Sequence, residues 1–184
     1  FRRVLFRSNS PLRIAVLAGG TSRERNISLE SGDAVAKSLA ERGHIVARID
    51  PAHIDLTDLD WSSFDVAFLA LHGTFGEDGH VQQILEEAGV PFTGSDSVAS
   101  RLAFSKSAAK ERFFQNGVPT PPYVLIHESD SAARIQQQAA ALGFPLAVKP
   151  DGQGSSLGIT IVRTPEELPQ ALARCFHFDR SEEH

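Results

Sequence analysis

The chain has 184 residues, of which 41% are hydrophobic and 22% charged, a balance typical of a globular protein with one domain or two small ones. A single cysteine, Cys175, excludes a disulfide framework and fits a reducing compartment. The net charge of −5, with one Trp and one Tyr for base stacking, argues against nucleic acid as a partner. Because no apolar run is long enough to cross a bilayer and no signal peptide is recognisable, we expect a cytoplasmic protein without membrane contact.

Both ends of the chain carry residues that we expect to be foreign to the protein. Val4–Ser8 and Arg180–His184 can be encoded by two DNA strings that are reverse complements of each other and that resemble a short-read sequencing adapter. We therefore expect residues 1–8 and 180–184 to be non-native tails, and we expect the chain to stop within a domain.

Strands and helices are expected to alternate along the first half of the chain. A buried strand over residues 13–18 ends at the loop Gly19–Ser22, and a helix follows from Ser28, its expected N-cap, to Gly43. Further strands are expected over residues 44–49, 64–71 and 90–93, and further helices over residues 81–88, 98–104 and 106–116. This alternation predicts a parallel, doubly wound α/β sheet. Its ligands should bind beyond the carboxyl ends of the strands, in the loops 19–24 and 72–79.

A stiff, proline-rich connector, Gly117–Pro122, is expected to separate two domains, residues 9–117 and 118–179. Beyond it the pattern predicts a strand over 123–126, a helix over 130–142, two strands on either side of a glycine-rich loop, and a helix from residue 165. The second domain therefore begins as a further α/β unit.

The stretch Leu146–Gly158 joins a strand to a loop rich in glycine and serine. Pro150 favours an extended Lys149, so the lysine should end the strand with its ammonium at the strand's end. The glycines let the backbone approach an anion closely, and Ser155 and Ser156 offer hydrogen-bond donors. Two interpretations remain open from spacing alone: a phosphate-binding loop and an ordinary glycine-rich β-hairpin. The loop matches neither the dinucleotide-binding nor the Walker pattern.

Four stretches, in this order, resemble D-alanine–D-alanine ligases, which are ATP-grasp enzymes. They are LAGGTSRERNIS at 17–28, ALHGTFGEDG at 70–79, TGSDSVASRLAFSK at 93–106 and VKPDGQGSSLG at 148–158. The resemblance implies an N-terminal, Rossmann-like parallel-sheet domain that binds substrate, followed by the start of an ATP-grasp domain. It also implies a cytoplasmic enzyme of peptidoglycan synthesis, and hence of cell-wall biogenesis and cell shape.

The reaction implied by the resemblance uses ATP and Mg²⁺. ATP phosphorylates the carboxylate of one D-alanine, and the amine of a second D-alanine attacks the acyl phosphate, giving the dipeptide, ADP and phosphate. We assign no metal ligand, because the metal, adenine and oxyanion residues of the family are expected beyond this chain. The fragment is therefore expected to be inactive alone. The implied partners are D-alanine and ATP, and a homodimer is one arrangement open to the full-length protein.

The resemblance assigns Glu24 and His72 to the amino-acid site. Glu24 occupies the position that holds the ammonium of the first D-alanine, and His72 occupies the position that faces its carboxyl group. On pattern alone, Glu24 would be a solvated loop acid and His72 a packing residue. Glu77 and Asp78 precede a helix, and we expect them to favour its N-terminus instead of binding a metal.

The resemblance assigns Lys106 and Lys149 to the ATP phosphates. On pattern alone, Lys106 would be a solvated charge at a helix end. Ser155 and Ser156 lie on the loop that closes over the phosphates, where Ser155 also helps to tie the loop to Glu24. Two alternatives stay open: a related ligase that uses D-lactate or another acceptor, and a non-catalytic module that binds a small ligand.

Overall fold

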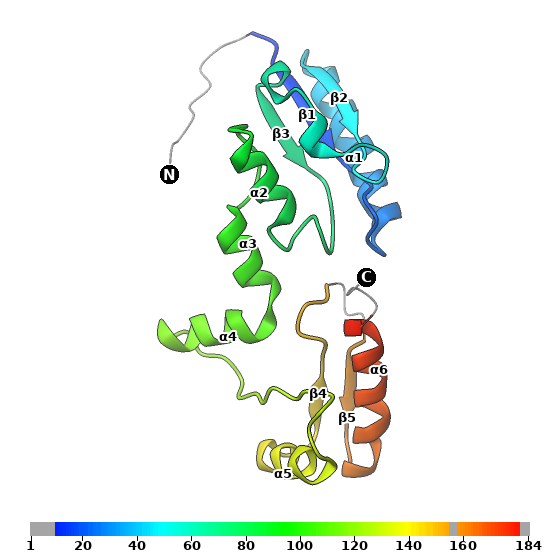
Figure 1. Ribbon diagram of the computed structural model, residues 1–184, viewed down its shortest axis with the longest axis vertical. Coiled ribbons are helices and arrows are strands. Elements are labelled where there is room, and N and C mark those ends of the chain that lie inside the picture. The colour runs from blue at the N-terminus through cyan, green and yellow to red at the C-terminus, as the bar shows by residue number, and fades with distance from the viewer. Residues whose placement is uncertain (1–9, 155–157, 181–184) are drawn as a thin grey trace. The chain divides into compact units, whose positions relative to one another are not determined.

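A computed structural model describes residues 10–154 and 158–180 (Figure 1). The chain divides into two compact units between Ser100 and Arg101, within helix α3 (Ser97–Phe104). The boundary expected after residue 117 lies one helix further along, and those domain limits stay a prediction. In the part of the chain that the structure describes, no helix is long and apolar enough to cross a membrane. The expected tails, Arg180 apart, and the two loop serines at 155 and 156 lie outside the described residues.

The first unit is built on a parallel sheet of three strands in the order β2-β1-β3. In the register of this sheet, Leu17 pairs with Ile49 on one side and with Leu69 on the other, so the three strands reach the same edge together. The expected parallel α/β sheet is confirmed. The elements are β1 (Arg13–Leu17), α1 (Arg25–Glu41), β2 (Ile45–Ile49), the 3-10 turns Leu56–Asp58 and Trp61–Ser63, β3 (Val66–Leu69) and α2 (His80–Glu87).

Both faces of this sheet are covered, because β1 is apolar on both sides. Ile14 and Val16 pack in one buried cluster with Ala36 of α1. Ala15 and Leu17 point to the opposite face and pack in a second cluster with Leu85 and Val81 of α2. A continuous apolar run such as this one is typical of a strand buried on both faces, and it fixes the sheet edge from which the ligand loops leave.

The second unit combines helices with a two-stranded antiparallel sheet. Val148 and Val162, one from each strand, pack with Leu168, Leu172 and Ala139 in its core. The strands run on either side of the glycine-rich loop, so the loop does close a hairpin, as the simpler interpretation predicted. The elements are α4 (Lys106–Gln115), α5 (Ala132–Leu142), β4 (Leu146–Val148), β5 (Thr160–Val162), the 3-10 turn Pro165–Glu167 and α6 (Leu168–Arg180).

Several expected elements have different ends in the structure, and three differ in ways that have a physical reason. Helix α1 begins at Arg25, and its N-cap is Glu24, because the hydroxyl of Ser28 is used inside the fold and caps nothing. Residues 90–93 contribute one parallel bridge, between Ala67 and Phe92. Residues 123–126 form no strand with the residues described, since a strand requires a neighbouring backbone and β4 is paired there only with β5.

Candidate active site

The loop that follows β1 lies at the carboxyl edge of the sheet, where the sequence places a ligand loop. Gly19 and Gly20 both have positive φ, 97° and 74°, which favours glycine. A Cβ atom on Gly19 would lie 2.5 Å from Oδ1 of Asp50, the residue that follows β2. Glycine at this position therefore lets a carboxylate from the neighbouring strand approach the loop backbone.

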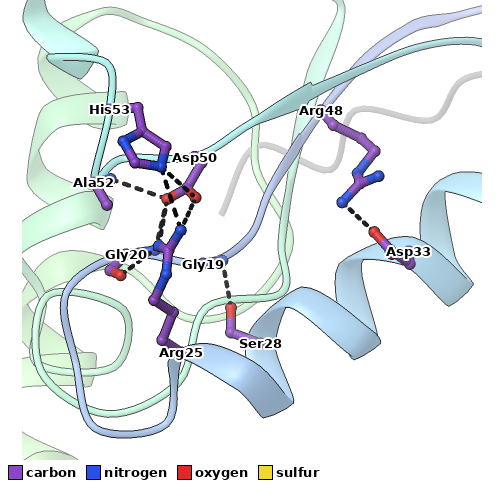
Figure 2. A network of polar contacts seen from close by, with 9 residues as sticks. All are labelled: Gly19, Gly20, Arg25, Ser28, Asp33, Arg48, Asp50, Ala52 and His53. Carbon is purple, nitrogen blue, oxygen red and sulfur yellow. Dashed lines mark hydrogen bonds and ion pairs between the residues drawn. The ribbon is translucent and has the colours of Figure 1, made fainter.

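An ion pair between Arg25 and Asp50 fastens this loop (Figure 2). The guanidinium donates to both carboxylate oxygens, with Nη2 to Oδ2 at 2.6 Å and Nη1 to Oδ1 at 3.0 Å. Nη1 also donates to the carbonyl of Gly20 at 2.7 Å, while Asp50 Oδ1 accepts from the amides of Gly20 at 2.9 Å and Ala52 at 3.0 Å. The pair thus holds both polar groups of the Gly20 backbone.

The Arg25 guanidinium, in hydrogen-bond contact, holds the pKa of Asp50 well below its usual range, and the backbone amides add to this effect against some desolvation. A depressed pKa in the folded state stabilises the fold above the unfolded value of about 4, and this contribution is lost as the pH falls below that value. The ion pair therefore makes the stability of the fold decrease at acid pH.

We expect Asp50→Asn to flatten the acid dependence of stability. Between pH 5 and pH 3 the urea midpoint of the native protein should fall more steeply than that of the variant, because only the native protein must protonate this carboxylate. Asp33→Asn is the matched control, since it removes a carboxylate from a more exposed pair with Arg48 on the same unit. Equal slopes for the native protein and Asp50→Asn would contradict the assignment.

Ser28 ties the same loop to α1 and β3. Its hydroxyl is fully buried, accepts a hydrogen bond from the Gly19 amide at 2.8 Å and donates one to the Ala70 carbonyl at 2.7 Å. A single side chain therefore joins the ends of two neighbouring strands to the first turns of the helix.

The structure brings Glu24 next to the segment that contains His72. Ser22 Oγ donates to the His72 carbonyl at 2.7 Å, and a Cβ atom on Gly73 would lie 2.6 Å from Glu24 Oε2. Glu24 therefore lies against the segment that contains His72, although the two residues come from loops after different strands. Both side chains are half-buried, which leaves each accessible to a small ligand.

The imidazole of His72 is held between two neighbours. Its Nδ1 lies 3.5 Å from Glu77 Oε1, and its Nε2 lies 3.4 Å from Ser31 Oγ. Glu77 Oε2 also accepts from the Gly73 amide at 3.1 Å, so this carboxylate orients both the ring and the backbone beside it. A carboxylate and an imidazole close together can bind the ammonium and carboxyl groups of an amino acid.

Asp78 lies at the start of the helix, as expected, whereas Glu77 accepts from a loop amide, that of Gly73. Asp78 accepts from the amides of Phe75 at 2.7 Å and His80 at 3.1 Å, next to the first turn of α2. Among residues 10–154 and 158–180, no group of three His, Cys, Asp or Glu side chains is placed to hold a metal ion.

In the second unit, Lys106 and Lys149 line one cavity of about 510 Å³, whose apolar walls include Leu146 and Leu172. Lys149 follows β4 directly, because the strand ends at Val148, one residue earlier than expected. Lys106 Nζ donates to the carbonyl of Gln153 at 2.6 Å, so this lysine reaches the glycine-rich loop. Two cations beside an apolar cavity suit a ligand with phosphates at one end and a flat apolar group at the other.

Asp151 fixes the first of these lysines. Its carboxylate accepts from the hydroxyl of Ser105 at 2.7 Å and from the amide of Ser107 at 2.7 Å, and its backbone carbonyl accepts from the Lys106 amide at 3.1 Å. A carboxylate at a helix N-terminus is favourable, and here it attaches α4 to the end of β4. At the other side of α4, Lys110 Nζ donates to Thr120 Oγ1 at 2.9 Å, so the helix belongs to the second unit.

Sequence reasoning missed Arg25, Asp50 and Asp151. The signal for Asp50 was available, since it directly follows a strand predicted to lie in the same parallel sheet as β1, and carboxyl ends of parallel strands meet at one edge. Nothing in the spacing distinguishes Arg25 from its neighbour Arg23, because only the fold shows which side chain reaches the strand end.

Two family models match the chain. The model described as D-ala D-ala ligase N-terminus matches residues 53–95, and the model described as D-ala D-ala ligase C-terminus matches residues 113–181. A curated D-alanine–D-alanine ligase of Geobacter sulfurreducens is 44% identical over 170 residues, which are 91% of this chain and 52% of that protein.

Solved structures agree with the sequence comparisons. The crystal structure of D-alanine–D-alanine ligase from Bacillus anthracis matches with a TM-score of 0.81 at 32% identity, over 91% of this chain and 55% of that one. A structure of the same enzyme complexed with ATP matches with a TM-score of 0.76 at 30% identity, over 91% and 56%. The fold of this chain is therefore that of the matched part of these D-alanine–D-alanine ligase structures.

The chain belongs to the D-alanine–D-alanine ligase family. It spans about half the length of the curated relatives that it matches.

Proposed function

We propose that the full-length protein that contains this chain is an ATP-dependent D-alanine–D-alanine ligase, a cytoplasmic enzyme of peptidoglycan synthesis. The observation that carries the proposal is that Glu24 meets the His72–Gly73 segment at the carboxyl edge of the first sheet. This arrangement offers a negative charge for an ammonium and an imidazole for a carboxyl group, which are the two ends of an amino acid.

The second unit provides the nucleotide part of the proposal. Lys106 and Lys149 supply two positive charges at one cavity with apolar walls. The relative solved with ATP supports this choice of nucleotide. We propose that both lysines bind phosphate oxygens, with the loop that contains Ser155 and Ser156 next to them.

In the proposed reaction, a carboxylate oxygen of the first D-alanine attacks the terminal phosphorus of ATP, and ADP leaves. The amine of the second D-alanine then attacks the acyl carbon, phosphate leaves with the C–O electron pair, and the amine loses a proton. Glu24 holds the first amino acid by its ammonium and His72 faces its carboxyl group, while Lys106 and Lys149 bind the phosphates and offset their negative charge. Mg²⁺ would add to this charge compensation, and no residue described here is assigned to it.

The experiment that tests the proposal is D-alanine-dependent phosphate release by the purified full-length protein with ATP and Mg²⁺. We expect release with D-alanine and none without it, and dipeptide as the product. The 184-residue chain assayed alongside should show no turnover, because it spans about half of its relatives and its described residues hold no metal-binding group. Binding of D-alanine or ATP without phosphate release by the full-length protein would instead indicate a binding module, and D-lactate preferred as acceptor would indicate the related ligase.

A further inference from the structure

Arg25 lies directly after Glu24 in the sequence, and its side chain contacts Asp50 and the Gly20 carbonyl. Helix α1 begins at Arg25, with Glu24 as its N-cap, so the position of Glu24 is set by the place where the first residue of the helix is anchored. That anchor is the two-pronged contact of the Arg25 guanidinium with the Asp50 carboxylate (Figure 2). A two-pronged contact of this kind restrains the orientation of the guanidinium as well as its distance from the carboxylate.

The same two side chains determine the path of the loop before Glu24. The carbonyl of Gly20 accepts from Arg25, and the amide of Gly20 donates to Asp50, so neither group can rotate without breaking the contact. With Gly20 fixed at one end and Arg25 at the other, the three residues between Gly20 and Glu24 have little freedom. Ser22 adds a third point of attachment at the His72 carbonyl.

Charge gives the pair a second consequence. A guanidinium one residue from Glu24 would compete with a substrate ammonium for the Glu24 carboxylate if it were released. Asp50 accepts the guanidinium with both oxygens, and its side chain is only 20% exposed, compared with 58% for Asp33 in the pair with Arg48. The partly buried pair therefore keeps the charge of Arg25 away from the amino-acid site.

We infer that Arg25 and Asp50 are positioning residues for amino-acid recognition: together they hold the loop Gly20–Glu24 so that the Glu24 carboxylate is presented to the ammonium of the substrate. Because the pair acts through Glu24, its role rests on the proposed function. Its effect should therefore appear in the Michaelis constant for the first D-alanine and not in the constant for ATP.

The test compares Arg25→Met, Arg25→Lys and Asp50→Asn in the full-length enzyme. We expect Arg25→Met and Asp50→Asn each to raise KM for the first D-alanine about tenfold, as is typical when the partner that orients a ligand-binding group is lost, with KM for ATP unchanged. Arg25→Lys keeps the charge without the fork and should restore part of the affinity. The double variant Arg25→Met with Asp50→Asn should raise KM for the first D-alanine no more than either single variant, because both substitutions remove the same interaction.

The matched control is the other arginine–aspartate pair on this unit, between Arg48 of β2 and Asp33 of α1 (Figure 2). Arg48→Met should leave both Michaelis constants unchanged, since exposed ion pairs contribute little and this one lies away from the loop. Asp50→Asn preserves side-chain shape and an oxygen acceptor for the Gly20 and Ala52 amides, so it remains informative if Arg25→Met does not fold.

A second readout needs no activity. In the 184-residue chain, the amide resonances of Gly20 and Glu24 should shift in Asp50→Asn and stay in place in Arg48→Met. Unchanged KM for D-alanine in an active, folded Asp50→Asn enzyme, or equal changes for D-alanine and ATP, would overturn the inference alone. A native enzyme without D-alanine-dependent phosphate release would overturn the proposed function and the inference together.

Discussion

Glu24→Gln in the full-length enzyme should raise the Michaelis constant for the first D-alanine about 30-fold and leave that for ATP nearly unchanged. Removing one partner of a charge-assisted contact typically costs about 2 to 5 kcal/mol, and the lower value applies because Glu24 is half-buried. At about 1.4 kcal/mol for each factor of ten, 2 kcal/mol corresponds to about 30-fold. The amide preserves the shape of the side chain, so the loss is one of charge. Steady-state kinetics with each substrate varied in turn measures it.

Glu30→Gln is the matched control for this prediction. Glu30 lies on the same helix, and its side chain is exposed, so the same change of charge occurs away from the loop. Both Michaelis constants should stay at their native values in this variant. Equal increases for D-alanine and ATP in Glu24→Gln would show that Glu24 does not belong to the amino-acid site.

Gly32→Ala should destabilise the first unit by about 2 kcal/mol. A Cβ atom at position 32 would overlap the Cβ of Ala18, where α1 crosses the end of β1. Overpacking of this kind costs about 3 kcal/mol at the upper end of its usual range. Alanine regains about 1 kcal/mol over glycine through its helix propensity, so the clash outweighs the gain. Thermal unfolding should show a loss of about 10 °C.

Ser38→Ala provides the comparison for Gly32→Ala. Ser38 is exposed on the same helix, so alanine there adds helix propensity without a new packing contact. This variant should melt at the native temperature or slightly above it. A Gly32→Ala protein as stable as Ser38→Ala would mean that α1 can move away from β1 at little cost, and that the close approach at Gly32 does not fix the helix.

The sheet and the edge at which its loops gather could be predicted because hydrophobic periodicity is a local property. Four consecutive apolar residues of β1 are buried on both faces of a parallel sheet, as their pattern indicates. Loops after such strands collect at one edge, and the structure does bring Glu24 and the His72–Gly73 segment together there. That Lys106 and Lys149 lie at one site was expected from the resemblance alone, since no local pattern links positions 43 residues apart in the sequence.

Local signals also misled at Ser28. A serine before an apolar helical stretch is a good N-cap by propensity, but the buried amide of Gly19 and the carbonyl of Ala70 both require partners, and Ser28 supplies them. The helix could then begin earlier, at Arg25, where the side chain finds Asp50. Helix limits therefore depended on contacts that exist only after the chain has folded.

The sequence by itself determined the fold class, the family and the types of side chain at the site, because these follow from apolar periodicity and from motifs of consecutive residues. Only the tertiary structure decided which charges are paired. Nothing in the sequence distinguishes Arg25 from Arg23, and neither Asp50 nor Asp151 belongs to a recognisable motif. The register of the strands brings Asp50 close to Gly19, and the start of a helix brings Ser105 into contact with Asp151. Coulombic and hydrogen-bond energies depend on distances of a few ångströms, and such distances between remote residues are set by packing.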